Sequence, residues 1–238
     1  QLFEHILDGT NTSLARKKAR LAFSNFTESN QQYSPVINEV DDEGLGFTLH
    51  NYPNVFCRDQ VDIGARFMLK NLPNVTKANQ VIIDLGCGNG ILGTSLLLQN
   101  KHSENKAKLV FVDESHMAIA SAKSTLFCSD ASDESKETAK FFVGHCLQEF
   151  ANEGDSESVC NVDTVICNPP FHQQNTVIDD IAWQMFLDAK KVLKPGGELR
   201  IVGNRHLDHS EKLSKLFGGC KVIASNQKFV ILSATKAQ

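Results

Sequence analysis

The hydrophobic and polar positions after residue 80 follow two alternating patterns. Short apolar runs predict buried parallel strands, in VIIDL, KLVFVDES, KFFVGHCL, VDTVIC and ELRIVGN. The segments between and after them have helical composition or spacing, in ILGTSLLLQN, HMAIASAKSTLF, IDDIAWQMFLDAKKVL and SEKLSKLFG. CKVIAS and KFVILSA predict a closing antiparallel hairpin. The order predicts an α/β fold with a doubly wound, mostly parallel seven-stranded sheet and an antiparallel C-terminal hairpin.

Other segments are less regular. GFTLHNYPNVF alternates like a strand until Pro53, and DQVDIGARFMLKNL has apolar residues at helical spacing. The basic run SLARKKAR (13–20) is helical in composition and suits either a solvated helix face or an RNA or phosphate contact. CSDASDESKETAK predicts a surface loop, and Lys194-Pro195-Gly196-Gly197 predicts the end of the long helix.

Composition restricts the class of protein. A chain of 238 residues with 41% hydrophobic content fits one large domain, or one domain with an extension. No apolar run approaches the ~18–20 residues of a membrane span, and the first residues do not resemble a signal peptide. The net charge of −4 argues against a broad nucleic-acid-binding face. Seven cysteines without a Cys-x-x-Cys pair predict thiols in a reducing cytoplasm and no metal site.

A glycine-rich loop, DLGCGNG (84–90), follows the first strand of the regular region. Gly88 to Gly93 fits the G-x-G-x-x-G fingerprint of dinucleotide sites, and Asp113 lies about 20 residues further on, where a ribose-binding acid is expected. The same loop reads D-x-G-x-G-x-G, and its carboxylate would complement the sulfonium and ammonium of S-adenosylmethionine. The loop alone therefore leaves a nicotinamide enzyme as a rival.

A second unusual turn, NPPF (168–171), follows the fourth strand. Asn168 offers an amide oxygen, and Pro169 offers a carbonyl without an N–H, so the two suit an exocyclic amino group. Phe171 can stack on a planar ring. This combination favours methylation of an amino group on a planar substrate over a plain strand-ending turn, and over an NAD-dependent oxidoreductase.

NVFCRDQVDIGARF, DLGCGNG, VFVDES, CNPPFHQQ and ELRIVGNRHLD together resemble the bacterial ribosomal RNA guanine-N2 methyltransferases RsmC and RlmG, over roughly residues 50–238. The His-Gln-Gln after NPPF, VFVDES and NRHLD favour the RlmG type, which acts on 23S rRNA. The resemblance implies a Rossmann-like class I fold that uses S-adenosylmethionine, with ribosomal RNA as partner and a monomeric state. It also implies a catalytic domain at 51–238, with 1–50 as the linker from an N-terminal domain that a chain beginning at Gln1 lacks.

The resemblance assigns roles by position. The methionine part of the cofactor would contact Asp84, Gly86, Cys87, Gly88 and Gly90, and its ribose Asp113. Asn168 and Pro169 would hold the guanine amino group, with Phe171 stacking on the base. His145 stands where such families often carry Asp or Asn; it is either an adenine contact through its backbone or a loop histidine. Phe56, Arg58 and Asp62 would form a lid over the cofactor or a packing segment, and Asn204 and Arg205 would contact RNA or the target base. The basic run offers Arg16, Lys17, Lys18 and Arg20 as further RNA contacts, if it is not a solvated face.

Three rival functions stay open on the sequence. The same chemistry fits adenine N6 or a glutamine amide, and a non-catalytic module that binds S-adenosylmethionine during ribosome assembly is an alternative of another class. An NAD-dependent oxidoreductase is the third.

Overall fold

The computed structural model describes residues 8–16, 19–25, 35–148, 161–170 and 176–237. These residues divide into two compact units, Gln1–Val36 and Ile37–Gln238.

The first unit contains an antiparallel hairpin of β1 (Asp8–Thr12) and β2 (Ala22–Asn25). Between the two strands Arg16 and Ala19 exchange backbone hydrogen bonds of 2.8 and 3.0 Å. The helix predicted for 13–20 is therefore wrong in its described residues. Leu14 is 93% exposed, so apolar packing does not favour a helix there, whereas the hairpin pairs the backbone groups.

The second unit is built on a seven-stranded sheet in the order β10-β11-β9-β8-β5-β6-β7. Its strands are β5 (Gln80–Leu85), β6 (Ala107–Asp113), β7 (Lys140–Val143), β8 (Val162–Cys167), β9 (Leu193–Asn204), β10 (Lys221–Ser225) and β11 (Phe229–Thr235). The pairs among β5 to β9 are parallel, while β11 pairs antiparallel with both β9 and β10. The predicted sheet and its closing hairpin are confirmed.

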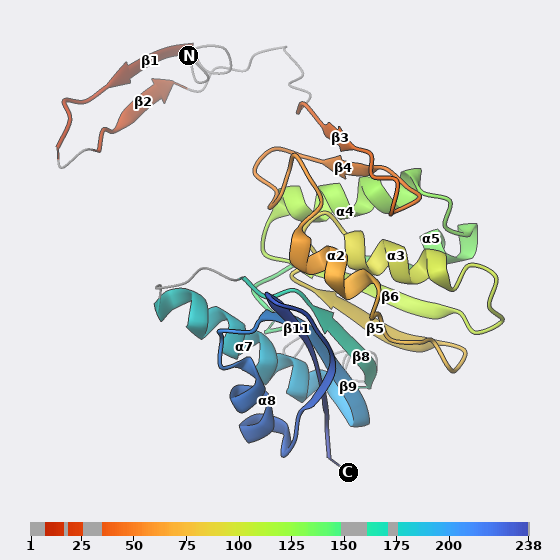
Figure 1. Cartoon of the computed structure of the whole chain (residues 1–238). Coiled ribbons are helices and arrows are strands. Elements are labelled where there is room, and N and C mark those ends of the chain that lie inside the picture. The colour runs from red at the N-terminus through yellow and green to blue at the C-terminus, as the bar shows by residue number, and fades with distance from the viewer. Residues whose placement is uncertain (1–7, 17–18, 26–34, 149–160, 171–175, 238) are drawn as a thin grey trace. The chain divides into compact units, whose positions relative to one another are not determined.

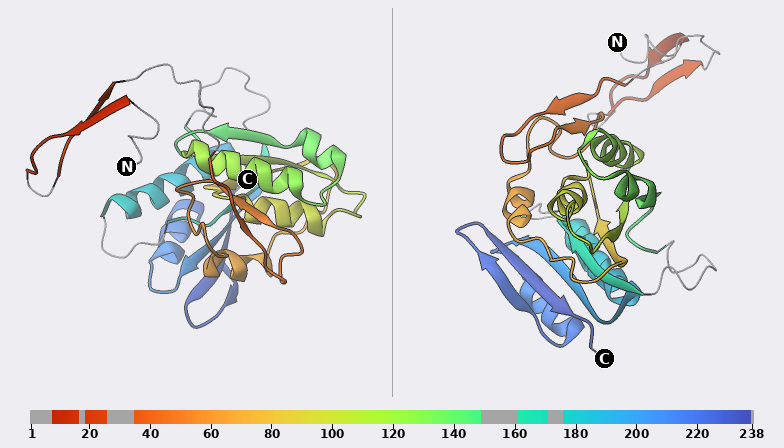
Figure 2. Two further views of the ribbon diagram at one scale, coloured as in Figure 1. Left: turned by 90° about the horizontal axis from the view of Figure 1, so that it is seen from above. Right: turned by 90° about the vertical axis from the view of Figure 1, so that its right-hand side faces the viewer.

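Helices cover both faces of this sheet (Figures 1 and 2). The helices of one layer are α2 (Ile63–Leu69), α3 (Ile91–Gln99) and α4 (His116–Cys128), and those of the other are α7 (Thr176–Val192) and α8 (His209–Phe217). Successive residues of β5 point to opposite layers: Ile82 packs in the first and Ile83 in the second, at 0% and 1% exposure. Because both faces are covered there, the central strands β5, β6 and β8 are apolar along most of their length, as their sequence predicted.

Several local predictions need correction. The stretch predicted as a surface loop contains α5 (Asp133–Thr138), where the Ser132 side chain accepts a hydrogen bond from Ser135 N and acidic residues occupy the first turn. The run GFTLHNYPNVF supplies only the short strand β4 (Leu49–Asn51), which pairs with β3 (Asn38–Val40). Helix α7 ends at Val192, and Pro195 and both following glycines lie within β9, where Gly196 N donates to Lys236 O over 2.9 Å.

The strand order reverses at β5. From its carboxyl end the chain passes to β6 on one side, while β8 pairs on the other. Diverging connections leave a crevice at such a point, which is where ligands of open α/β sheets bind. The fold thus brings the glycine loop, the end of β6 and the NPPF turn to one place.

Candidate functional site

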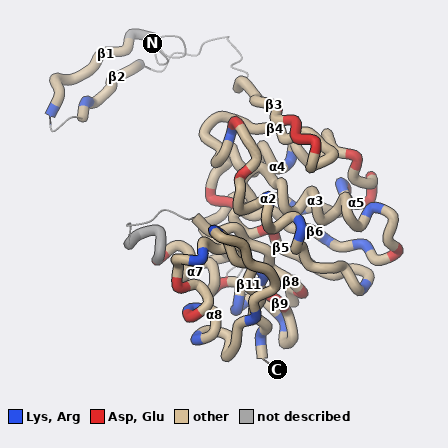
Figure 3. Tube along the Cα trace, viewed as in Figure 1, with Lys and Arg blue, Asp and Glu red and all other residues tan. Residues whose placement is uncertain are grey.

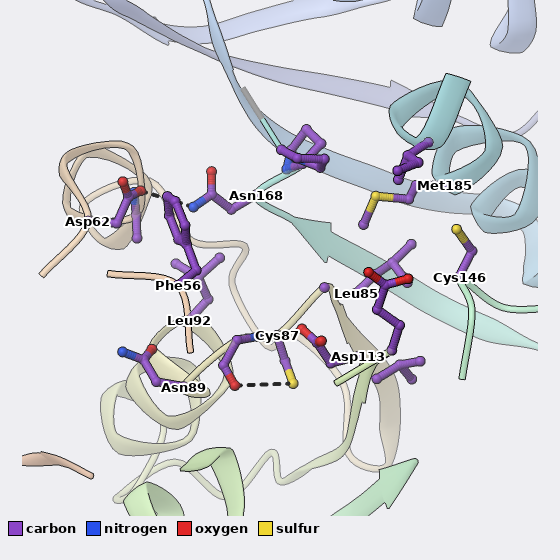
Figure 4. A pocket seen from close by; sticks show the side chains of 18 of the residues that line it. Phe56, Asp62, Leu85, Cys87, Asn89, Leu92, Asp113, Cys146, Asn168 and Met185 are labelled. Atoms are coloured by element: carbon purple, nitrogen blue, oxygen red, sulfur yellow. Dashed lines mark hydrogen bonds between the residues drawn. The ribbon is translucent and has the colours of Figure 1, made fainter. Parts of the chain in front are cut away.

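A cavity of about 320 Å³ lies at the carboxyl ends of β5, β6 and β8 (Figure 4). Four segments supply its polar and backbone lining: the glycine loop, the end of β6, the turn after β7 and the turn after β8. The lining residues from these segments include Gly86, Cys87, Gly88, Asn89, Asp113, Glu114, Gly144, His145, Asn168, Pro169 and Pro170. Asp62 from the start of α2 and Ile181 and Met185 from α7 complete the wall. The volume lies within the range of small-molecule pockets, ~300–1,000 Å³.

The backbone N–H groups of the glycine loop are largely used within the protein. Gly86 N and Cys87 N donate to Val112 O, over 2.8 and 3.0 Å. Gly88 N donates to Asp113 Oδ2 over 2.9 Å, and Gly90 N to Cys87 O over 2.8 Å. A pyrophosphate needs such groups to be free. The loop therefore does not favour the dinucleotide interpretation of its glycines.

Glycine is required at two loop positions for different reasons. Gly90 begins α3 in the left-handed region with φ 76°, and a Cβ there would lie 2.8 Å from Ala122 Cα. Gly88 has φ 54°, and a Cβ there would meet no heavy atom within 4 Å. Gly90 thus permits close packing of α3 against α4, whereas Gly88 is favoured by its left-handed backbone conformation alone.

The cavity wall is acidic. None of its described residues is Lys or Arg, while Asp62, Asp113 and Glu114 contribute carboxylates. Elsewhere in the second unit basic and acidic positions are interspersed along the chain (Figure 3). An acidic wall attracts a cation and opposes a polyphosphate. The wall therefore suits a ligand with a sulfonium and an ammonium group.

Asp84 lies behind this wall and does not line the cavity. It is 1% exposed, and its Oδ2 accepts a hydrogen bond of 2.9 Å from Gly93 N. Its Oδ1 has no hydrogen-bond partner among the described residues. Burial raises the pKa of this carboxyl to about 7, the Gly93 hydrogen bond opposes the rise, and the Asp113 charge adds to it. When it is ionised, the Asp84 carboxyl can therefore act on a cationic ligand through its electric field, without lining the cavity.

Asp113 does line the cavity, and it also braces the loop. Its Oδ2 accepts from Gly88 N and its Oδ1 from Ser115 N, both over 2.9 Å. Burial raises the pKa of the carboxyl, and the two backbone hydrogen bonds oppose the rise. Each carboxylate oxygen has a second lone pair, so Asp113 can still accept from hydroxyl groups.

Asn168 brings its side chain to the wall beside Pro169 and Pro170. Its Nδ2 donates to Asp62 Oδ2 over 3.0 Å (Figure 4). Its Oδ1 is buried and has no hydrogen-bond partner in the described part of the chain. A buried acceptor without a partner costs free energy, which a ligand can recover by donating a hydrogen bond to it. Phe171, the predicted stacking ring, lies outside the described residues.

The segment before β5 contributes more to the cavity wall and its support than its sequence indicated. Phe56 lines the cavity and is 57% exposed, and Asp62 caps α2 by accepting from Ala65 N over 2.7 Å. Arg58 does not line the cavity, but its carbonyl accepts from Asn51 Nδ2 over 2.8 Å. Asn51 in turn accepts from Asn89 Nδ2 over 3.0 Å, which ties the segment to the glycine loop.

The remaining predicted residues lie in different parts of the chain, and only one of those that the structure describes lines the cavity. His145 lines the cavity, with Nδ1 3.3 Å from Glu114 Oε2. Asn204 and Arg205 do not line it: Asn204 Oδ1 accepts from His206 N, and Arg205 Nη1 donates to Asn226 O over 3.1 Å. Arg16 and Arg20 belong to the first unit, and Lys17 and Lys18 lie outside the described residues.

Sequence reasoning missed several wall residues, namely Glu114, Asn89, Cys146, Ile181 and Met185. Glu114 and Asn89 adjoin residues that the motifs did identify, so proximity to a motif was an available signal. Ile181 and Met185 belong to an amphipathic helix, and nothing in their pattern separates the cavity wall from core packing.

In the part of the chain that the structure describes, no group of three or more His, Cys, Asp and Glu side chains could hold a metal ion. Within the same residues, no helix combines the length and the apolar character of a membrane span.

The chain resembles known proteins in sequence. Residues 46–233 match the family described as the methyltransferase small domain. The protein named ribosomal RNA large subunit methyltransferase G of Pseudoalteromonas atlantica is 48% identical over 235 residues, and that of Erwinia tasmaniensis is 46% identical over 236. Both alignments cover 99% of this chain and 59% of the relative, so the chain spans about three fifths of these curated relatives. The resemblance inferred from the motifs is confirmed.

A solved structure shares the fold. The 16S rRNA N2 G1207 methyltransferase RsmC of T. thermophilus, in complex with AdoMet and guanosine, superposes with a TM-score of 0.73 at 22% identity. The match covers 98% of this chain and 59% of that one. Together with the observed strand order, it confirms the predicted class I methyltransferase fold.

Proposed function

Since the chain belongs to the methyltransferase small domain family, we propose that it transfers a methyl group from S-adenosylmethionine to the N2 amino group of a guanine in 23S rRNA. The catalytic domain is proposed to be 51–238, with 1–50 as the linker to a further domain. The names of the relatives support large-subunit rRNA as the substrate, and the guanosine bound to the RsmC neighbour supports the base.

The buried Oδ1 of Asn168, which has no hydrogen-bond partner among the described residues, is the observation that carries the proposal. Leaving a buried acceptor without a donor costs about 1–3 kcal/mol, which an exocyclic amino group would recover. Pro169 lies beside it at the cavity wall and has a carbonyl oxygen but no N–H to compete. Two acceptors directed at one –NH₂ group hold its two hydrogens and leave the nitrogen lone pair available.

The residues around the cavity fit S-adenosylmethionine. The cofactor would supply a methyl group made electrophilic by a sulfonium sulfur. Gly86, Cys87 and Gly88 would hold its methionine part, with the Asp84 carboxylate beneath them, and Asp113 would accept from the ribose hydroxyls. The acidic wall complements the sulfonium and the ammonium, which is why this cofactor fits better than a dinucleotide.

Catalysis in this arrangement depends on position. Asn168 and Pro169 orient the amino nitrogen, and no side chain needs to form a covalent intermediate. Proper alignment of two bound reactants contributes as much as ~7–11 kcal/mol to lowering a barrier. The protein's part is therefore to fix the amino group and to exclude water around it.

Methylation of 23S rRNA by the full-length protein, followed by digestion to nucleosides, tests the proposal. With S-adenosylmethionine labelled in its methyl group, we expect the label in N2-methylguanosine. Label in N6-methyladenosine would replace guanine by adenine as the target, and label only in protein would indicate a glutamine amide. Tight binding of S-adenosylmethionine with no transfer to any of these would favour a non-catalytic assembly module.

A further inference from the structure

One hydrogen bond joins two parts of the cavity wall that lie 106 residues apart in the chain. Asn168 Nδ2, in the turn after β8, donates to Asp62 Oδ2, at the start of α2, over 3.0 Å (Figure 4). Both side chains line the cavity. The contact is therefore part of the site. It links the start of α2 to Asn168, the residue proposed to hold the amino group of the target base.

The chemistry of the two groups fixes the direction of the Asn168 amide. A carboxylate can only accept a hydrogen bond, so the amide must present its –NH₂ to Asp62. Rotation of the amide by half a turn would bring two acceptor oxygens together and break the hydrogen bond. The amide oxygen is consequently held away from Asp62, where it is buried without a partner in the described residues.

Asp62 is itself held firmly. Its Oδ2 also accepts from Ala65 N over 2.7 Å, and its Oδ1 lies 3.8 Å from the Cys57 thiol. Helix α2 is anchored in the core by Ala65 and Met68, which are 1% and 0% exposed. The carboxylate is thus attached to a rigid element, and it can define the orientation of a neighbouring amide.

We propose that Asp62 is a positioning residue for methyl transfer. It holds the Asn168 amide with the carbonyl oxygen turned toward the amino group of the target. The inference rests on the proposed function for its kinetic consequence. Its structural content, one fixed amide orientation, concerns only these two side chains.

Asp62→Ser is the informative variant. Serine is as good a helix N-cap as aspartate, so α2 keeps its first-turn hydrogen bond, but the shorter side chain cannot reach Asn168. We expect kcat to fall roughly 10- to 100-fold, the range that one hydrogen bond to a charged group supports. The melting temperature should change little, and the Kd of S-adenosylmethionine should rise by a smaller factor than kcat falls, because Asp113 and Glu114 remain in the acidic wall. Asp59→Ser is the matched control: it removes a carboxylate of the same segment whose side chain is 84% exposed, and kcat should stay at the wild-type value.

A double-mutant cycle separates positioning from a general structural effect. If Asp62 acts through Asn168, Asp62→Ser should add almost nothing to the loss already caused by Asn168→Ala. A loss of equal size in both backgrounds would overturn the proposal. So would wild-type kcat in Asp62→Ser.

A readout without turnover distinguishes failure of this inference from failure of the proposed function. In full-length protein labelled with ¹⁵N-asparagine, the Asn168 side-chain –NH₂ should exchange slowly with solvent, and Asp62→Ser should accelerate the exchange. Fast exchange in the wild type would sink the positioning role whatever the substrate. Protected exchange in a wild-type protein that methylates no RNA would instead refute the proposed function alone.

Discussion

The substitution Asp84→Asn tests whether burial raises the pKa of the carboxyl that precedes the glycine loop. Burial raises the pKa of Asp84 from 3.8 to about 7, so the folded chain favours the protonated form. Below pH 4 folded and unfolded chains both hold the proton, and between about pH 4 and pH 7 only the folded chain keeps it. The stability contributed by this group is therefore present at low pH and lost as the pH rises toward 7.

The size of this loss in the free energy of unfolding follows from the same pKa. At about 1.4 kcal/mol per pH unit, a span of about three units amounts to a loss of about 4 kcal/mol in the free energy of unfolding. An asparagine is neutral throughout and can still accept from Gly93 N, so the variant lacks this loss. Its buried –NH₂ adds a cost of about 1–3 kcal/mol that does not depend on pH.

Urea unfolding in the absence of ligand, monitored by circular dichroism at pH values from 5 to 8, measures the difference in the free energy of unfolding between wild type and variant. The stability of Asp84→Asn relative to wild type should rise by about 3 kcal/mol across this range, because about two pH units of the titration fall within it. Glu137→Gln, which removes one carboxylate from an exposed position of α5, is the control. Parallel pH profiles for Asp84→Asn and wild type would refute the reasoning. Above pH 7, where the Asp84 carboxyl is ionised, the variant should also bind S-adenosylmethionine more weakly, since it removes a negative charge near the cationic ligand.

Three further substitutions follow from the site. Asn168→Ala should lower kcat by ~100-fold or more while the Kd of S-adenosylmethionine stays nearly constant, as measured by single-turnover kinetics and calorimetry; an active variant would contradict the acceptor role. Asp113→Ala should weaken S-adenosylmethionine binding by ~10- to 100-fold, since it removes the ribose acceptor and the brace on Gly88 N. Phe56→Ala should raise KM for rRNA by ~5- to 100-fold without lowering the melting temperature if the Phe56 ring, which is 57% exposed at the cavity, stacks on a base of the RNA. An unchanged KM would exclude base stacking by Phe56.

The local sequence indicated the elements of the second unit well, because apolar runs and helical spacing are short-range signals. The exceptions have physical causes. The 13–20 run has helical composition but forms part of a hairpin, where ladder hydrogen bonds outweigh propensity. Helix α5 was hidden by polar residues, although Ser132 followed by two acids is an N-terminal capping signal.

For the site, the sequence by itself determined which motifs end the strands, and a parallel sheet necessarily gathers those ends at one edge. Only the tertiary structure decided how each group is used. It placed Asp84 behind the wall, satisfied the loop N–H groups internally, and set Asp62 against Asn168. The physical reason is range: strand and helix periods are written in neighbouring residues, whereas burial and a hydrogen bond across 106 residues exist only after the chain has packed.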